Sequence, residues 1–263
     1  MYEFTYHKPA SLADAATLLG AEEAKLVAGG MTLVPTLKQR LAKPSDLVDL
    51  AAIGGLTGIT EDGGGVTIGA MTRHADVNRS PVVKRLIPAL SALAGMIGDP
   101  AVRNRGTIGG SIANNDPAAD YPAAVVALGA TVVTSKREIA GEDFFTGMFE
   151  TALEPDEIIT AVKFPAPQAA AYQKFRNPAS RYAIVGVFVA RTAAGVRVAV
   201  TGAGPCVFRV PEMEAALAQS FSADAIKDIA VPDDGLNTDI HASAEYRAHL
   251  VNVMARRAVA ACA

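Results

Sequence analysis

Two glycine-rich segments constrain this chain more than any other feature of its sequence. They are LVAGGMTL at residues 26–33 and RGTIGGS at residues 105–111. Glycine permits positive φ and has no Cβ, so consecutive backbone N–H groups can converge on an anion such as phosphate. A Gly-Gly pair between a strand and a helix is also an ordinary turn, and both interpretations stand for either segment taken singly. Neither segment fits G-x-x-x-x-G-K-[ST], so the sequence does not support nucleoside triphosphate hydrolysis at a P-loop.

Composition and charge exclude several classes of function. Half of the 263 residues are hydrophobic (50%) and 19% are charged, which is enough for a sizeable core and about two domains. A net charge of −3 without a run of Lys or Arg argues against a nucleic-acid partner. The stretch from Leu86 to Ala101 is interrupted by Pro88, Gly95 and Pro100 and is too short to span a bilayer, and residues 1–12 do not resemble a secretion signal. We therefore expect a soluble, cytoplasmic protein.

The residues that usually carry metal or nucleophile chemistry form no pattern. The two cysteines, Cys206 and Cys262, are far apart, so we expect neither a disulfide framework nor a cluster that needs four thiolates. The four histidines show no metal-ligand spacing, and no G-x-S-x-G nucleophile elbow is present. The sequence therefore predicts no metal site and no catalytic residue in this chain.

The order of predicted elements indicates an α+β protein rather than a regular βαβ alternation. A helix capped by Ser11, a strand at 24–30 and a helix capped by Thr32 are followed by short strands up to residue 70, helices over 73–97 and further strands over 130–165. The Pro- and Ala-rich FPAPQAAAY at 164–172 is the expected boundary between a domain at 1–168 and a second at 169–263. The second domain begins with strands and ends with helices.

Two further motifs allow more than one interpretation. VTGAGPCV at 200–207 resembles a dinucleotide-binding fingerprint, but Val207 replaces its third glycine and Pro205 removes a donor, so we predict a hairpin or turn. Asp116 and Asp120 could form a pair of acid/base carboxylates. Alternatively, Asp116 caps a helix that starts at Pro117 and Asp120 meets sugar hydroxyls, and we favour the cap for Asp116.

Five segments in order resemble the FAD-binding medium subunit of molybdenum hydroxylases, the family of the carbon monoxide dehydrogenase flavoprotein and the xanthine dehydrogenase flavin domain. The segments are LVAGGMTLVPTLKQRLAKPSDLVDL, TIGAMTRHADV, IGDPAVRNRGTIGGSIANNDPAADYPAAVVALGA, FFTGMFETALEPDEIITAVKFP and KFRNPASRYAIVGV. The resemblance covers nearly the whole chain. It implies an FAD-binding fold of the vanillyl-alcohol oxidase (PCMH) type in two subdomains at 1–168, followed by a smaller α+β C-terminal domain at 169–263.

The resemblance also implies a set of FAD-binding residues. It places the FAD pyrophosphate, bound non-covalently, between two glycine loops, with Asp120 at the sugar or adenine side, Ile97 and Ile159 as apolar contacts and Lys174 near the flavin. Tyr182 matches a position that covers the isoalloxazine, although a core tyrosine at a strand end fits it equally well. The first loop comprises Leu26, Val27, Ala28, Gly29, Gly30, Met31, Thr32 and Leu33, and the second comprises Thr107, Ile108, Gly109, Gly110 and Ser111.

The implied function is electron transfer within a larger complex. The resemblance implies a large molybdopterin-binding subunit and a small [2Fe–2S] subunit, in a heterotrimer or its dimer, that pass electrons to FAD and then to an external acceptor. Two alternatives remain: a free-standing FAD-dependent oxidase or dehydrogenase with its own substrate, and a non-catalytic nucleotide-binding module. The molybdopterin and the clusters are expected on the partner subunits only.

Overall fold

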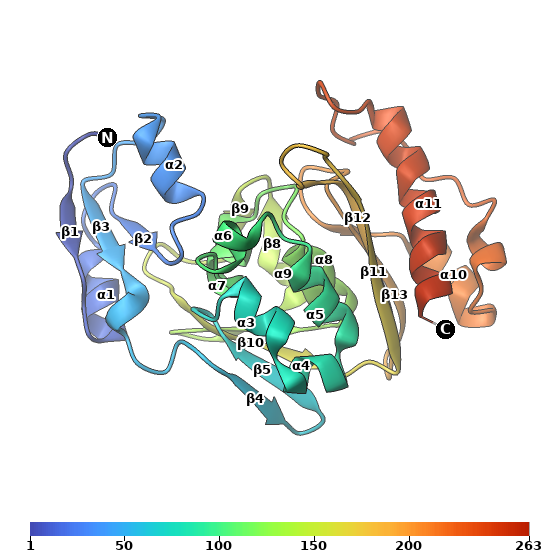
Figure 1. The fold of residues 1–263 in the computed structure, drawn as a ribbon, viewed down its shortest axis with the longest axis horizontal. Coiled ribbons are helices and arrows are strands. Elements are labelled where there is room, and N and C mark those ends of the chain that lie inside the picture. Colours follow the sequence, from blue (N-terminus) through green and yellow to red (C-terminus); the bar gives the residue numbers. More distant parts are fainter. Residues whose placement is uncertain (263) are drawn as a thin grey trace.

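The N-terminal subdomain is a small parallel sheet flanked by two short helices (Figure 1). The computed structural model describes residues 1–262. The sheet has the order β1-β3-β2, formed by Thr5–His7, Asp46–Asp49 and Lys25–Val27. The hydroxyl of Ser11 accepts from the N–H of Asp14 and starts α1 (Leu12–Leu18), as predicted. Thr32 stands at the start of α2 (Leu33–Lys38), but its side chain makes no capping hydrogen bond. A 3-10 turn, η1, follows β3 at Leu50–Ala52.

The middle subdomain is built on a five-stranded antiparallel sheet of order β4-β5-β10-β6-β7. Its strands are Ile59–Asp62, Gly65–Gly69, Ile159–Pro165, Thr131–Thr134 and Glu138–Ala140, and a two-stranded ribbon joins β8 (Phe145–Gly147) to β9 (Glu150–Thr151). The helices are α3 (His74–Arg79), α4 (Pro81–Leu86), α5 (Pro88–Gly95), α6 (Pro100–Arg103), α7 (Ile108–Asn114), α8 (Tyr121–Ala127) and α9 (Gly141–Phe144).

The C-terminal part is an antiparallel sheet with helices on its outer face (Figure 1). Its strands, in sheet order, are β11 (Ala169–Arg176), β12 (Ala183–Thr192), β13 (Gly195–Thr201) and β14 (Phe208–Arg209), and its helices are α10 (Pro211–Gln219), η2 (Ala223–Ile226) and α11 (Ala244–Ala261). The turn that joins β13 to β14 contains Gly202 and Gly204, so the hairpin predicted for VTGAGPCV is confirmed. No helix among residues 1–262 is both long and apolar enough to cross a membrane.

Strand β12 links the two large cores because both of its faces are covered. Phe188 and Ala190 belong to the core of the middle subdomain, whereas Val187 and Val189 pack into the core around α11. Successive side chains of a strand point to opposite faces, so an uninterrupted apolar run is the pattern expected of a strand buried on both sides. The C-terminal sheet is thereby fixed against the helices of the middle subdomain, where α5 contacts β11 and α8 contacts β13.

The segment 116–120 belongs to the first domain and is hydrogen-bonded to the C-terminal sheet. The hydroxyl of Thr201 donates to the carbonyls of Pro117 (3.0 Å) and Ala119 (2.6 Å), and the N–H of Gly202 also donates to Pro117. The predicted helix cap at Asp116 is wrong: its carboxylate accepts from the N–H of Ala118 in a turn, and the next helix begins only at Tyr121. The hydrogen bonds to the C-terminal sheet hold this segment in a non-helical path.

Candidate functional site

A cleft of about 580 Å³ lies where the three parts of the chain meet. Its wall includes most of the residues singled out in the sequence: Leu26, Ala28, Gly29, Gly30, Met31, Thr32, Leu33, Ile97, Thr107, Gly109, Gly110, Ser111, Asp120, Ile159 and Tyr182. Three others lie behind that wall. Val27 and Ile108 pack beneath the two glycine loops, with Ile108 fully buried, and Lys174 is tied to Asp120.

The first glycine loop presents unpaired backbone donors to the cleft. Among residues 1–262, the backbone N–H groups of residues 28–33 have no hydrogen-bond acceptor in the protein. Gly30 has φ of +71°, a conformation that favours glycine. A run of free N–H groups in an irregular loop is a site for an anion, because buried or half-buried donors need an acceptor.

The second glycine loop has a different role from the one its sequence suggests. The N–H groups of Ile108 and Gly109 donate to the carbonyls of Thr72 (3.1 Å) and Ala70 (2.8 Å), and the N–H of Gly110 donates to the hydroxyl of Thr107 (3.1 Å). These donors are therefore already satisfied within the protein. The loop lines the cleft mainly through its bare backbone and the side chains of Thr107 and Ser111.

The two loops touch each other through glycine. A Cβ on Gly29 would lie 2.2 Å from the carbonyl oxygen of Arg105 and 2.7 Å from the Cα of Gly106. A Cβ on Gly110 would lie 3.2 Å from the Cβ of Ala28. The glycines in these segments thus bring two stretches of backbone together, which a spacing argument from sequence could not anticipate.

Asp120 carries a buried interdomain ion pair at the edge of the cleft. Its carboxylate lies 2.9 Å from the ammonium of Lys174 and accepts a hydrogen bond from the hydroxyl of Tyr172, both on β11. The Lys174 ammonium also donates to the carbonyl of Met96. Burial raises the pKa of the Asp120 carboxyl, and the Lys174 charge and the Tyr172 hydrogen bond offset part of that rise.

Aromatic side chains stand at the mouth of the cleft. Tyr182 is 49% exposed, which excludes the interpretation as a core tyrosine at a strand end, and Phe149 is 55% exposed. Partial burial and the nearby carboxylates Asp116 and Asp120 raise the pKa of Tyr182. Both aromatic rings are accessible to a planar ligand in the cleft.

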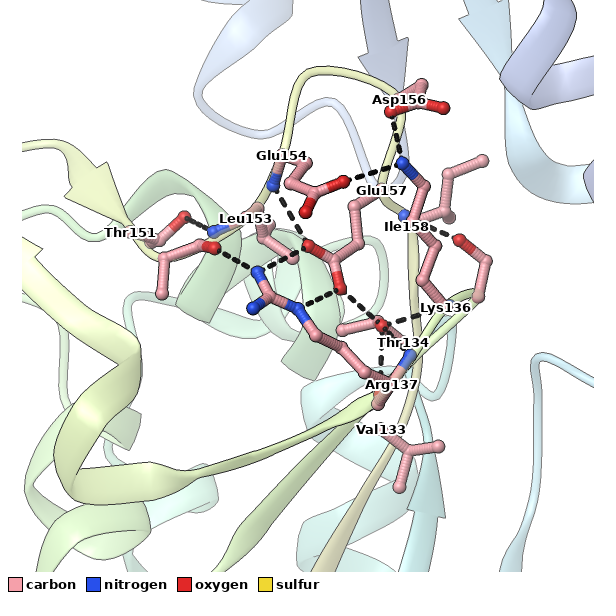
Figure 2. Close-up of polar contacts among 12 residues, drawn as sticks. Val133, Thr134, Lys136, Arg137, Thr151, Leu153, Glu154, Asp156, Glu157 and Ile158 are labelled. Carbon is pink, nitrogen blue, oxygen red and sulfur yellow. Dashed lines mark hydrogen bonds and ion pairs between the residues drawn. The ribbon is translucent and has the colours of Figure 1, made fainter.

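Glu157, which lines the cleft, is the centre of a polar cluster of side chains (Figure 2). Its buried carboxylate accepts from the guanidinium of Arg137 (3.0 and 3.1 Å), the hydroxyl of Thr134 (2.6 Å) and the N–H of Glu154 (2.9 Å). These hydrogen bonds lower the pKa of Glu157 to about 2, the Arg137 contribution being the largest. The cluster fixes the backbone that leads into Ile158 and Ile159, which line the cleft.

We expect Glu157→Gln to lower the free energy of unfolding by about 2 kcal/mol at pH 7, because charged hydrogen bonds are lost from a buried position. A carboxyl whose folded-state pKa is depressed stabilises the fold above its unfolded pKa and loses that effect as the pH falls through the folded value. The difference from wild type should therefore shrink between pH 4.5 and about 2. Urea unfolding at several pH values measures it, with Glu154→Gln, an exposed partner of Lys136, as a control expected to change stability by less than about 0.5 kcal/mol.

Sequence reasoning missed several residues of the wall. They include Met71, His74, Phe149, Glu157, Ile158 and Arg181. His74 occurs in the segment TIGAMTRHADV, but its spacing from the other histidines fits no metal site, and nothing else in the local sequence marks it as a binding residue. Met71, Phe149, Glu157 and Ile158 come from separate loops of the first domain, and Arg181 comes from the loop between β11 and β12 in the C-terminal part, so only the folded chain brings them together.

Family models match both parts of the chain. Residues 2–167 match the FAD binding domain in molybdopterin dehydrogenase, and residues 170–262 match the CO dehydrogenase flavoprotein C-terminal domain. The chain belongs to the family of FAD-binding medium subunits of molybdenum hydroxylases. It is an oxidoreductase subunit whose cofactor is FAD, and the family, fold class and FAD predicted from the sequence are confirmed.

Individual relatives are similar over nearly their whole length. The chain is 38% identical to the nicotine 6-hydroxylase medium subunit of Paenarthrobacter nicotinovorans, covering 97% of this chain and 95% of that one. It is 35% identical to the carbon monoxide dehydrogenase medium chain of Hydrogenophaga pseudoflava, covering 97% and 96%. A solved structure of reconstituted CO dehydrogenase from Oligotropha carboxidovorans superimposes with a TM-score of 0.91 at 34% identity, covering 99% of this chain and 98% of the other.

Proposed function

We propose that this chain binds FAD in the cleft and carries electrons from [2Fe–2S] clusters of a partner subunit to an external acceptor. The observation that supports the proposal most is the run of free N–H groups at residues 28–33 beside the second glycine loop. The FAD pyrophosphate carries the negative charge that such donors bind. Asp120, which is paired with Lys174 of the C-terminal domain, and Tyr182 also line the cleft and would contact other parts of the cofactor.

FAD and the residues of this chain would make different contributions to the reaction. When bound, FAD supplies redox chemistry in which one or two electrons are exchanged. The residues of this chain bind and orient it: the first loop through backbone donors, Ser111 through its hydroxyl, Ile97 and Ile159 through apolar contact. The chain has two cysteines, fewer than the four ligands a [2Fe–2S] cluster takes, so the clusters and the molybdopterin are proposed to belong to a small and a large partner subunit, as in a heterotrimer or its dimer.

Expression with and without partner subunits tests this function. Alone, the chain should be yellow and reducible by dithionite, and it should not oxidise aldehydes, purines or N-heterocycles. With the large and small subunits it should co-purify, and its flavin absorbance should bleach when the substrate of the complex is added. Turnover by the isolated chain would support a free-standing oxidase instead, and a colourless chain that binds adenine nucleotides but not FAD would support a binding module.

A further inference from the structure

His74 is a buried polar residue in the wall of the cleft that the binding residues discussed above leave without a role. It is the first residue of α3 and is 4% exposed. The backbone N–H of His74 donates to the carbonyl of Gly106 (3.0 Å), and a Cβ on Gly106 would lie 2.6 Å from the Nε2 atom of the His74 ring. The imidazole therefore lies directly against the start of the second glycine loop.

The surroundings of His74 determine its charge and its tautomer. Burial, together with the guanidinium of Arg103, lowers the pKa of His74 to about 4, so the ring is neutral at pH 7. Within residues 1–262, its Nδ1 is fully buried and has no hydrogen-bond partner. A buried N–H without an acceptor is rarer in proteins than a buried unpaired acceptor, which favours the tautomer that carries its hydrogen on Nε2. His74 thus provides a neutral N–H donor on the side that faces the loop and the cleft.

The second glycine loop needs such a donor. Its own N–H groups at Ile108, Gly109 and Gly110 are bonded to Thr72, Ala70 and Thr107. Three central backbone donors of this loop are therefore not available to an anion, so side-chain donors beside the loop are needed as well. His74, Thr107 and Ser111 line the cleft beside it, and within residues 1–262 the Thr107 hydroxyl is bonded only as an acceptor from Gly110.

We propose that His74 binds the cofactor by donating a hydrogen bond from Nε2 to a diphosphate oxygen of FAD beside the second glycine loop. The proposal rests on the proposed position of FAD in this cleft. It explains why a polar ring is kept in a position where Nδ1 and the nearby Tyr121 hydroxyl are both buried without partners. Such groups disfavour folding of the chain without cofactor, so their retention at His74 fits a binding role.

Two substitutions separate a binding role from a structural one. In the full chain freed of flavin, His74→Leu should raise the FAD dissociation constant about tenfold, since one hydrogen bond to a charged group is lost. Thermal unfolding of the same flavin-free variant should be unchanged or higher, because an unpartnered polar group has been removed. His74→Gln, whose amide nitrogen reaches nearly as far as Nε2, should stay within about threefold of the wild-type constant.

Titration of the flavin-free proteins with FAD, followed by flavin fluorescence, measures the constants. Tyr121→Phe is the matched control, because it removes the neighbouring buried polar atom without altering the cleft wall, and it should bind FAD like wild type. Unchanged binding in His74→Leu, or weakened binding in His74→Gln, would overturn the role of His74. If the leucine variant does not fold, His74→Phe, which keeps a planar ring but has no N–H donor, takes its place with the same expected tenfold loss, and unchanged binding in that variant overturns the role of His74. Absence of FAD binding by the wild-type chain would instead overturn the proposed function.

Discussion

Gly29→Ala is expected to weaken FAD binding at least 100-fold, which corresponds to about 2.8 kcal/mol. The added Cβ would lie 2.2 Å from the carbonyl oxygen of Arg105. Because that oxygen belongs to the backbone and the Cβ is fixed to the Cα of residue 29, no side-chain rotation relieves the clash. The first loop must then move away from the second. That movement displaces the free N–H groups of residues 28–33 from the surface where the second loop completes the cleft.

The measurement is a titration of flavin-free protein with FAD, accompanied by thermal unfolding. Gly54→Ala is the control: it is the same chemical change at an exposed glycine where an added Cβ meets nothing within 4 Å. It should bind FAD like wild type. An unchanged dissociation constant in Gly29→Ala would mean that contact between the loops does not shape the cofactor site.

The sequence predicted local structure where local chemistry determines it. The Ser11 cap and the hairpin at 200–207 depend on neighbouring residues, and the structure agrees with both. The Asp116 cap failed because a distant side chain, Thr201, bonds the carbonyls of the following segment and keeps it out of a helix. A long-range hydrogen bond leaves no trace in local propensity.

The same distinction applies to the site. Glycine pattern and resemblance located both loops, but they did not reveal that the first presents free donors while the second has its donors paired with Thr72 and Ala70. Nor could they show that Lys174 faces Asp120 across 54 positions of sequence. The pairing of the second loop depends on how it packs against residues 70–72, and the ion pair depends on how β11 packs against the segment 116–120. Residues that act through another residue are the hardest to assign from sequence.

Lys174→Met should destabilise the protein by about 3 kcal/mol at neutral pH, because it leaves the buried carboxylate of Asp120 without its cation. Methionine keeps the apolar length of the lysine stem, so the loss reports mainly the charge. Tyr172 still donates to Asp120, but one neutral hydrogen bond offsets only part of the cost of burying a charge. FAD affinity should fall as well, since Asp120 lies in the cleft wall.

The pH dependence of this loss has a definite sign. Burial already raises the pKa of Asp120 above its ordinary value of 3.8, and removing Lys174, which lowers it, raises it further. Between 3.8 and that higher value the folded variant binds more protons than the unfolded chain, so its stability falls as the pH rises through this range and is level above it. The deficit relative to wild type should therefore be largest at pH 7 and should shrink as the pH approaches 4.

A second substitution separates the charge from the packing. Asp120→Asn combined with Lys174→Met removes both charges and leaves a neutral amide, so the double variant should be more stable at pH 7 than Lys174→Met alone. Urea unfolding of wild type, both single variants and the double variant gives the coupling energy between the two side chains. A Lys174→Met variant as stable as wild type at pH 7, with no change between pH 4 and 7, would show that the interdomain ion pair does not hold the wall of the cleft in place.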